Sequence, residues 1–395
     1  MNRKTDCIAC GGSELIQILD LKEQPLANSY HNGEKLKEYP LGLNLCKSCY
    51  HLQLTHIVNP DELFKNYLYI SGTTKTLKDY FKWFAKWSSE KLTPFNKCVL
   101  DIACNDGSQL DAFKELGWNT YGVDPAENLH PISSKNHNVI CKYFDHTAFW
   151  NQFDIIVAQN VFAHTENALD FLQNCAYRMH DESLLFIQTS QAEMVKSNQF
   201  DTIYHEHLSF FNINSMLALS KRSALKLVDV QKVPVHGTSY VFVFSKNKDI
   251  VKNYEPMLAE EINDGLTDIN TYLSYAKNVE VVVSELKSFV DAKKADGVKV
   301  VAYGAAAKGM TLLNYAGIIP DLIVDDNEMK VGLFTPGTNV KIDHPSILSQ
   351  IDEPIVLLPL AWNFYEEIKN RVSEYRSGKG DIWVKYFPSL QIENL

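Results

Sequence analysis

The sequence predicts an α/β protein in three parts: a small N-terminal domain held together by a metal ion, then two domains of alternating strands and helices. Two Cys-x-x-Cys pairs lie within the first 50 residues, and strand–turn–helix patterns start at residues 97 and 298. The length of 395 residues also suits two or three domains. We expect these domains to span residues 1–80, 81–250 and 251–395.

Composition excludes several classes of protein. The chain has 38 Lys and Arg against 48 Asp and Glu, a net charge of −10, whereas nucleic-acid binders more often present a basic face. The apolar stretch at 355–362 is too short for a membrane helix, which needs about 20 residues. No apolar signal segment follows Met1. We therefore expect a cytoplasmic protein without nucleic-acid or membrane partners, in which thiols stay reduced.

The N-terminal cysteines form two pairs, Cys7 with Cys10 and Cys46 with Cys49. Two Cys-x-x-Cys turns can complete a four-thiolate tetrahedral zinc site, which leaves no position open for catalysis. A thioredoxin-like redox pair and simple buried thiols are the alternatives. We expect a structural Zn²⁺ on which the first 55 or so residues depend for folding.

From residue 97 the pattern is that of a cofactor-binding βαβ unit. A buried strand at 98–103 leads into an acidic turn and a helix at 109–116, and the next strand ends in Asp124. The G-x-G-x-x-G of dinucleotide sites is absent, and acidic residues suit a cationic sulfonium better than a pyrophosphate, which favours S-adenosylmethionine over NAD. An α/β domain that binds no cofactor is the alternative. The predicted cofactor ligands are Asp101, Ala103, Asn105, Asp106, Gly107, Asp124, Pro125, Asp145 and Asn160.

The densest polar cluster is Tyr204-His205-Glu206-His207. Histidine is the usual general base at neutral pH, and a nearby carboxylate can orient it. A metal site and a structural, hydrogen-bonded turn are the alternatives. His236-Gly-Thr-Ser239 is a second candidate loop, although a lone histidine there is more often structural.

The C-terminal third predicts a long core-facing helix over 257–295 and then a second Rossmann-like half, again without G-x-G-x-x-G. Lys308 at the start of its first helix suits an anion. By itself this region could bind a nucleotide or simply pack against the rest.

Taken together, the motifs resemble those of the S-adenosylmethionine-dependent C-methyltransferases of nucleotide-linked deoxysugars, such as the TDP-4-keto-6-deoxysugar C-3′ methyltransferases. The resemblance runs over nearly the whole chain and rests on the order and joint presence of its pieces. They are Cys7-x-x-Cys with Pro25-Leu-Ala-Asn28, Cys46-x-x-Cys, Asn66-Tyr-x-Tyr-x-Ser-Gly, Asn105-Asp-Gly, Gly122-Val-Asp-Pro-Ala, Tyr204-His-Glu-His, Tyr303-Gly-Ala-x-x-Lys-Gly, Lys330-x-Gly-x-x-x-Pro-Gly-Thr and Ala361-Trp-Asn.

The resemblance implies a zinc-binding N-terminal domain, a central class I (Rossmann-like) methyltransferase domain and a C-terminal Rossmann-like domain, with the substrate between domains. The substrate would be a TDP- or GDP-linked 4-keto-6-deoxyhexose, and the protein a monomer or small homo-oligomer. By resemblance His207 is the base that removes the C3 proton and Glu206 orients it, while Tyr204, His164 and Tyr69 contact the sugar or its keto oxygen. The further substrate contacts implied are Tyr67, Ser71, Gly72, His205, His236, Ser239, Tyr303, Gly304, Lys308, Trp362 and Asn363.

Two departures from the family pattern matter. Ala103 stands where the family often has glycine, and we expect cofactor binding to be kept provided that its φ is negative. The usual His-Gly-Gly-Ser-Leu-Arg reads His236-Gly-Thr-Ser-Tyr-Val, and the lost arginine leaves the identity of the nucleotide open. An O- or N-methyltransferase and a noncatalytic nucleotide-sugar-binding relative are the competing functions.

Overall fold

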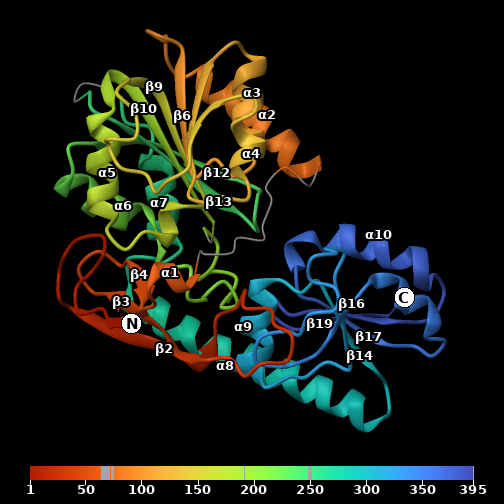
Figure 1. Cartoon of the computed structure of the whole chain (residues 1–395). Coiled ribbons are helices and arrows are strands. Elements are labelled where there is room, and N and C mark those ends of the chain that lie inside the picture. The colour runs from red at the N-terminus through yellow and green to blue at the C-terminus, as the bar shows by residue number, and fades with distance from the viewer. Residues whose placement is uncertain (64–71, 73–74, 191, 248–250, 395) are drawn as a thin grey trace.

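The computed structural model describes residues 1–63, 72, 75–190, 192–247 and 251–394 (Figure 1). The N-terminal part is a four-stranded antiparallel sheet in the order β11-β4-β3-β2, and its edge strand β11 comes from far along the chain. Ser209 and Phe210 of β11 pair with Gln53 and Leu52 of β4. The elements here are β1 (Asn2–Arg3), β2 (Leu15–Pro25), β3 (Glu38–Cys46), β4 (Leu52–Leu54), β5 (His56–Ile57), α1 (Pro60–Leu63) and β11 (Ser209–Phe210).

The central domain is a seven-stranded sheet in the order β12-β13-β10-β9-β6-β7-β8. Strand β13 runs antiparallel to both of its neighbours, and the others are parallel, which is the strand order of class I methyltransferases. Its strands are β6 (Cys98–Ile102), β7 (Asn119–Val123), β8 (Asn138–Ile140), β9 (Phe153–Gln159), β10 (Met179–Ser190), β12 (Lys226–Val233) and β13 (Ser239–Ser245). Its helices are α2 (Lys75–Ser89), α3 (Ser108–Glu115), α4 (His130–Ser133), η2 (Phe162–His164), α5 (Ala168–Tyr177) and α6 (Ile213–Arg222).

The C-terminal domain is a six-stranded sheet in the order β16-β15-β14-β17-β18-β19, parallel except for β19. This confirms a second Rossmann-like unit. Its strands are β14 (Val300–Tyr303), β15 (Leu322–Val324), β16 (Ile342–Asp343), β17 (Val356–Pro359), β18 (Ile382–Lys385) and β19 (Gln391–Asn394). Its helical segments are α9 (Ala307–Ala316), η3 (Pro345–Gln350), η4 (Trp362–Phe364) and α10 (Tyr365–Arg376).

The expected single helix over 257–295 is wrong in its first part. The chain forms α7 (Glu255–Asn263) and α8 (Ile269–Ala295), and between them Gly265 adopts a φ of +79°. Asp268 then caps α8 by accepting a hydrogen bond from the backbone N–H of Asn270. The 27-residue α8 contacts β2, α9 and β14, so it joins the N-terminal sheet to the C-terminal domain (Figure 1).

Direct contacts also join the N-terminal part to the C-terminal domain. The Tyr30 hydroxyl donates to the Ala305 carbonyl, and His31 and Phe334 exchange two backbone hydrogen bonds. Within the described residues, no helix is long and apolar enough to cross a membrane.

Candidate functional site

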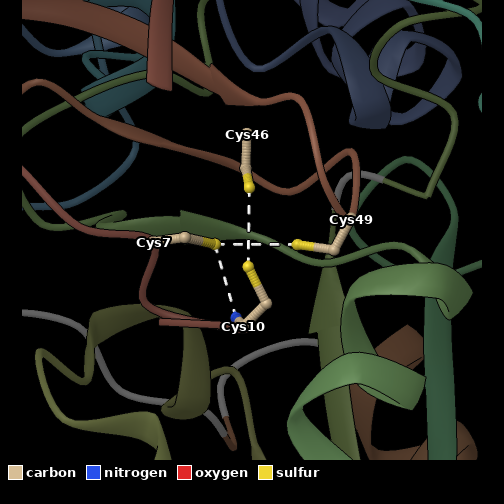
Figure 2. A group of neighbouring side chains, drawn as sticks. All are labelled: Cys7, Cys10, Cys46 and Cys49. Atoms are coloured by element: carbon tan, nitrogen blue, oxygen red, sulfur yellow. Dashed lines mark hydrogen bonds between the residues drawn. The ribbon is translucent and has the colours of Figure 1, made fainter. Parts of the chain in front are cut away.

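The four N-terminal cysteine sulfurs converge on one point (Figure 2). Cys7 Sγ lies 3.6 Å from Cys49 Sγ, and Cys10 Sγ lies 3.5 Å from Cys46 Sγ. A tetrahedral zinc ion with Zn–S bonds of about 2.3 Å requires sulfurs about 3.8 Å apart, so the cluster fits the ion closely. Backbone N–H groups of Cys10 and Gly12 donate to the sulfurs of Cys7 and Cys10, which stabilises thiolates. These four residues form a structural zinc site.

A cavity opens at the carboxyl end of β6 and encloses about 610 Å³ of space, part of it open to solvent. This is where ligands bind in open α/β sheets. Five predicted cofactor ligands line it: Asp101, Ala103, Asn105, Asp106 and Asn160. His236, predicted as a substrate contact, also lines it. Six further lining residues were not predicted, although an aromatic-rich segment precedes β6 in the sequence: Leu77, Tyr80, Phe81, Cys104, Gln109 and Gln159.

The electrostatics of this cavity suit a cation. Burial raises the pKa of Asp101 well above its usual range, and the neighbouring Asp124 and Asp106 raise it further. The lining residues that the structure describes include no Lys or Arg. A sulfonium cofactor would relieve this clustering of acids, so the residues present fit S-adenosylmethionine.

The remaining predicted cofactor residues lie beside the cavity or away from it. Gly107, at φ +84°, is the N-cap residue just before helix α3. The Asp124 carboxylate accepts hydrogen bonds from the backbone N–H groups of Asn105 and Ala126, which fixes the acidic turn, and Pro125 follows it directly. Asp145 does not reach the cavity: it pairs with Lys142 at 2.8 Å, and its side chain is 45% exposed. The sequence correctly placed Asp145 after strand β8, but it did not predict the direction in which the loop turns the side chain.

Ala103 adopts a φ of +60°, so the expectation of a negative φ is wrong. Its backbone N–H donates to the Val123 carbonyl, and this bond holds the turn in its left-handed conformation. In this conformation the Cβ of alanine causes steric strain, which glycine avoids because it has no Cβ.

We expect Ala103→Gly to raise the free energy of unfolding by about 1 kcal/mol, because glycine removes the strain at positive φ. Urea denaturation of the unliganded protein measures the change. Ala112→Gly, inside helix α3, is the matched control and should lower stability by roughly 1 kcal/mol. A loss of stability in both variants would contradict the strain at residue 103.

Half-buried Tyr204 and buried His207 form a hydrogen-bonded pair. The ring of His207 is fixed at both nitrogens, because Nδ1 contacts the Thr202 carbonyl at 2.8 Å and Nε2 contacts the Tyr204 hydroxyl at 2.9 Å. Since a carbonyl can only accept, Nδ1 carries the proton and Nε2 is the basic nitrogen. Burial holds the pKa of His207 well below its usual range, and the nearby His164 lowers it further. Neutral His207 is therefore the form present near pH 7.

His164 lies beside this pair, with its ring centre 5.0 Å from that of His207. Burial lowers its pKa to about 4, although hydrogen bonds to the backbone of Glu206 and Asn160 act in the opposite direction. The structure thus brings together three of the predicted catalytic residues, Tyr204, His207 and His164.

Glu206 points elsewhere than expected. The partner that orients His207 Nδ1 is the Thr202 carbonyl, whereas Glu206 Oε1 accepts a hydrogen bond of 2.6 Å from Asn28 of the N-terminal domain. Burial raises the pKa of Glu206 to about 7, and the bond from Asn28 partly offsets that rise. The sequence contained Asn28 as part of a motif but gave no sign of this contact.

His205 also departs from its expected role. Its Nε2 contacts the Tyr39 carbonyl at 3.3 Å and its ring packs edge-on against that tyrosine, so it faces the N-terminal sheet. His205 and His207 therefore point in different directions, and His205 packs between the domains instead of facing the substrate.

The C-terminal domain contributes Trp362 and Lys308. Trp362 Nε1 donates to Asp201 Oδ2 at 2.6 Å, and the Lys308 ammonium lies 4.6 Å from the centre of the Trp362 ring. Gly237 leaves room for that ring, since a side chain there would meet it at 2.6 Å. Burial lowers the pKa of His236, and the nearby Lys308 lowers it further. His236 also lines the cofactor cavity. These groups extend the site toward the C-terminal domain.

Other predicted substrate residues are placed differently. Ser239 is fully buried and donates to the Val235 carbonyl, so it belongs to the core. Tyr303 donates to Asp326 within the C-terminal domain, next to Gly304, while Asn363 follows Trp362 in η4. Gly72 meets the cofactor turn, because its N–H donates to Asp106. Tyr67, Tyr69 and Ser71 lie outside the described residues.

Family models cover most of the chain in three consecutive segments. The model described as "Putative zinc binding domain" matches residues 7–64, the "Methyltransferase domain" matches 60–230 and the "C-methyltransferase C-terminal domain" matches 234–388. This order agrees with that of the zinc site, the class I sheet and the second Rossmann-like unit.

Similar proteins include the C-methyltransferase NovU of Streptomyces niveus, which is 28% identical over 398 residues covering 95% of this chain and 94% of that protein. A ubiquinone biosynthesis O-methyltransferase of Coxiella burnetii is 25% identical over 190 residues, 43% of this chain and 80% of that protein. Among solved structures, magnesium protoporphyrin IX methyltransferase of Synechocystis PCC 6803 with bound SAM has a TM-score of 0.33 and 11% identity, and the match covers 44% of this chain and 79% of that one.

The zinc cluster, the acidic cofactor cavity and the full-length likeness to a C-methyltransferase agree with one another. The chain is an S-adenosylmethionine-dependent C-methyltransferase with a zinc-binding domain, a class I methyltransferase domain and a C-terminal Rossmann-like domain.

Proposed function

We propose that the protein methylates C3 of a nucleotide-linked 4-keto-6-deoxyhexose. The observation that carries this proposal is the Tyr204–His207 pair, whose basic nitrogen is kept neutral by burial beside the cofactor cavity. Methylation at carbon needs a base, because a C–H bond next to a ketone must first lose its proton. Transfer to oxygen or nitrogen makes a weaker demand for such a buried base.

In the proposed reaction His207 Nε2 takes the proton from C3, and the electrons of that C–H bond form the enolate. Tyr204 turns its hydroxyl from Nε2 to the former keto oxygen, where it donates to the developing negative charge. Bound S-adenosylmethionine supplies the electrophilic methyl group. A positioned base contributes about 10²–10⁴-fold to such a reaction.

Lys308 and Trp362 are the proposed substrate contacts from the C-terminal domain. Burial lowers the pKa of Lys308, while Asp201 raises it. The ammonium lies 4.6 Å from the centre of the Trp362 ring. A cation here suits the phosphates of a nucleotide, which the TDP- or GDP-linked substrate would bring. We propose a monomer or small homo-oligomer located in the cytoplasm.

The function is tested with a panel of nucleotide-linked 4-keto-6-deoxysugars and methyl-labelled cofactor. We expect a product whose labelled methyl gives a C–CH₃ signal in NMR and survives acid hydrolysis. An O–CH₃ signal would instead assign the protein to the O-methyltransferases. The absence of turnover with every sugar, despite cofactor binding, would favour a noncatalytic relative.

Asn28 gives a prediction about pH. Because its N–H donates to the Glu206 carboxylate and favours the ionised form, Asn28→Ala should raise the pKa of Glu206 further above 7. The acidic limb of the kcat/KM profile, where ionised Glu206 sets it, should then move to higher pH, so that activity at pH 7 falls and is recovered as the pH rises. Asn32→Ala, on the same segment, is the matched control. An unshifted profile in Asn28→Ala would show that Glu206 does not set that limb.

A further inference from the structure

Tyr80 lines the cofactor cavity, and its buried hydroxyl has no hydrogen-bond partner among the described residues. The residue is only 8% exposed, so water does not readily replace the missing partner. Helix α2 fixes the ring, which lies against Trp83 and Phe84 at centroid distances of 5.6 and 6.1 Å. Within the part of the chain that the structure describes, the hydroxyl is therefore held in place by packing alone.

Such a hydroxyl costs stability, because burying an unpaired polar group loses its bonds to water. Other deeply buried tyrosines here avoid that cost: Tyr272, Tyr275 and Tyr386 each donate to a backbone carbonyl. A phenylalanine at position 80 would pack equally well without the cost. A bound ligand that accepts a hydrogen bond from the Tyr80 hydroxyl would remove this cost.

The topology indicates which end of the cofactor it meets. Strand β6 lies between β7 and β9, and Asp124 at the end of β7 marks the side where such sheets hold ribose. Tyr80 belongs to the opposite side of β6, toward β9 and β10. The cavity residues Gln159 and Asn160 lie at the end of β9, and helix α2, which carries Tyr80, packs on β10 through the contact of Phe84 with Phe186. A cofactor whose ribose lies at Asp124 would extend its amino-acid tail to this side.

The tail carries an α-carboxylate, and the cavity offers it few donors. Among the described residues that line the cavity there is no Lys or Arg, whereas two acids, Asp101 and Asp106, are present. The side-chain amides of Gln109 and Gln159 each donate to a neighbour, Phe81 O and Gln109 Oε1. We propose that the Tyr80 hydroxyl donates a hydrogen bond to the α-carboxylate of S-adenosylmethionine and is the residue that recognises its amino-acid tail.

Binding of two cofactor analogues to Tyr80→Phe tests this role, measured by calorimetry on the full chain. S-adenosylhomocysteine has the α-carboxylate, and we expect its Kd to rise about tenfold, as for loss of a hydrogen bond to a charged group. 5′-Methylthioadenosine lacks the amino-acid tail, and its Kd should change less than twofold. The unliganded variant should unfold at the same or a higher temperature than the wild type.

Tyr275→Phe is the matched control, because it removes an equally buried hydroxyl that donates to Gln199 O. It should lower the unfolding temperature and leave both affinities unchanged. An unchanged Kd for S-adenosylhomocysteine in Tyr80→Phe, or equal weakening of both analogues, would overturn the proposal. Neither analogue involves the sugar, so this test is separate from that of the proposed substrate.

Discussion

His207→Asn should reduce turnover by at least about 10²-fold while leaving the affinity for S-adenosylhomocysteine nearly unchanged. The substitution removes Nε2, the basic nitrogen that the Thr202 contact leaves unprotonated. It keeps a polar side chain in a buried position, which limits damage to the fold. Single-turnover rates and analogue binding together separate loss of the base from loss of the site.

A second measurement isolates the proton-transfer step. With wild-type protein and a 4-keto sugar in D₂O, deuterium should enter at C3 in the absence of S-adenosylmethionine, and in His207→Asn it should not. His205→Asn is the matched control, because His205 faces Tyr39 and should retain exchange. Exchange at the wild-type rate in His207→Asn would assign the base to another residue.

Removal of zinc should have the other large effect, abolishing activity through loss of the N-terminal fold. The four thiolates hold together the turn before β2 and the turn at the end of β3, and β3 pairs with β4. Because β4 pairs in turn with β11, which begins two residues after His207, metal loss should release the catalytic turn. Hydrogen exchange in residues 204–210 should rise after chelation, and readdition of zinc should reverse it.

Cysteine substitutions provide the control for metal loss. Cys49→Ser should lower bound zinc and reproduce the effect of chelation, whereas Cys141→Ser, at an exposed cysteine, should change neither metal content nor activity. Full activity in a protein shown to contain no zinc would contradict the structural role of the ion.

The sequence predicted those features that depend on residues close together in the chain. The paired cysteines, the acidic turn after β6 and the Tyr204–His207 cluster are short segments whose chemistry is set by spacing, and each lies in a site or lines a cavity. The two Rossmann-like units followed from alternating strands and helices for the same reason.

Side-chain direction and long-range contacts could not be predicted in that way. Ser239 points into the core and Asp145 into solvent because the local backbone turns them there, which a spacing rule does not contain. The bond from Asn28 to Glu206 joins residues 178 positions apart, and only the packing of two domains creates it. The positive φ of Ala103 depends on its bond to β7 rather than on its own identity.

The pairing of β4 with β11 has a consequence for how the chain folds during synthesis. His51 and Ser209, whose side chains are 3.2 Å apart, are separated by 158 positions, so the N-terminal sheet cannot be completed until most of the central domain has been made. Until then β4 presents an open strand edge, the kind of surface through which nascent chains aggregate. We therefore expect an isolated N-terminal fragment to be poorly soluble even when loaded with zinc, and the addition of a peptide spanning 204–212 to improve its solubility.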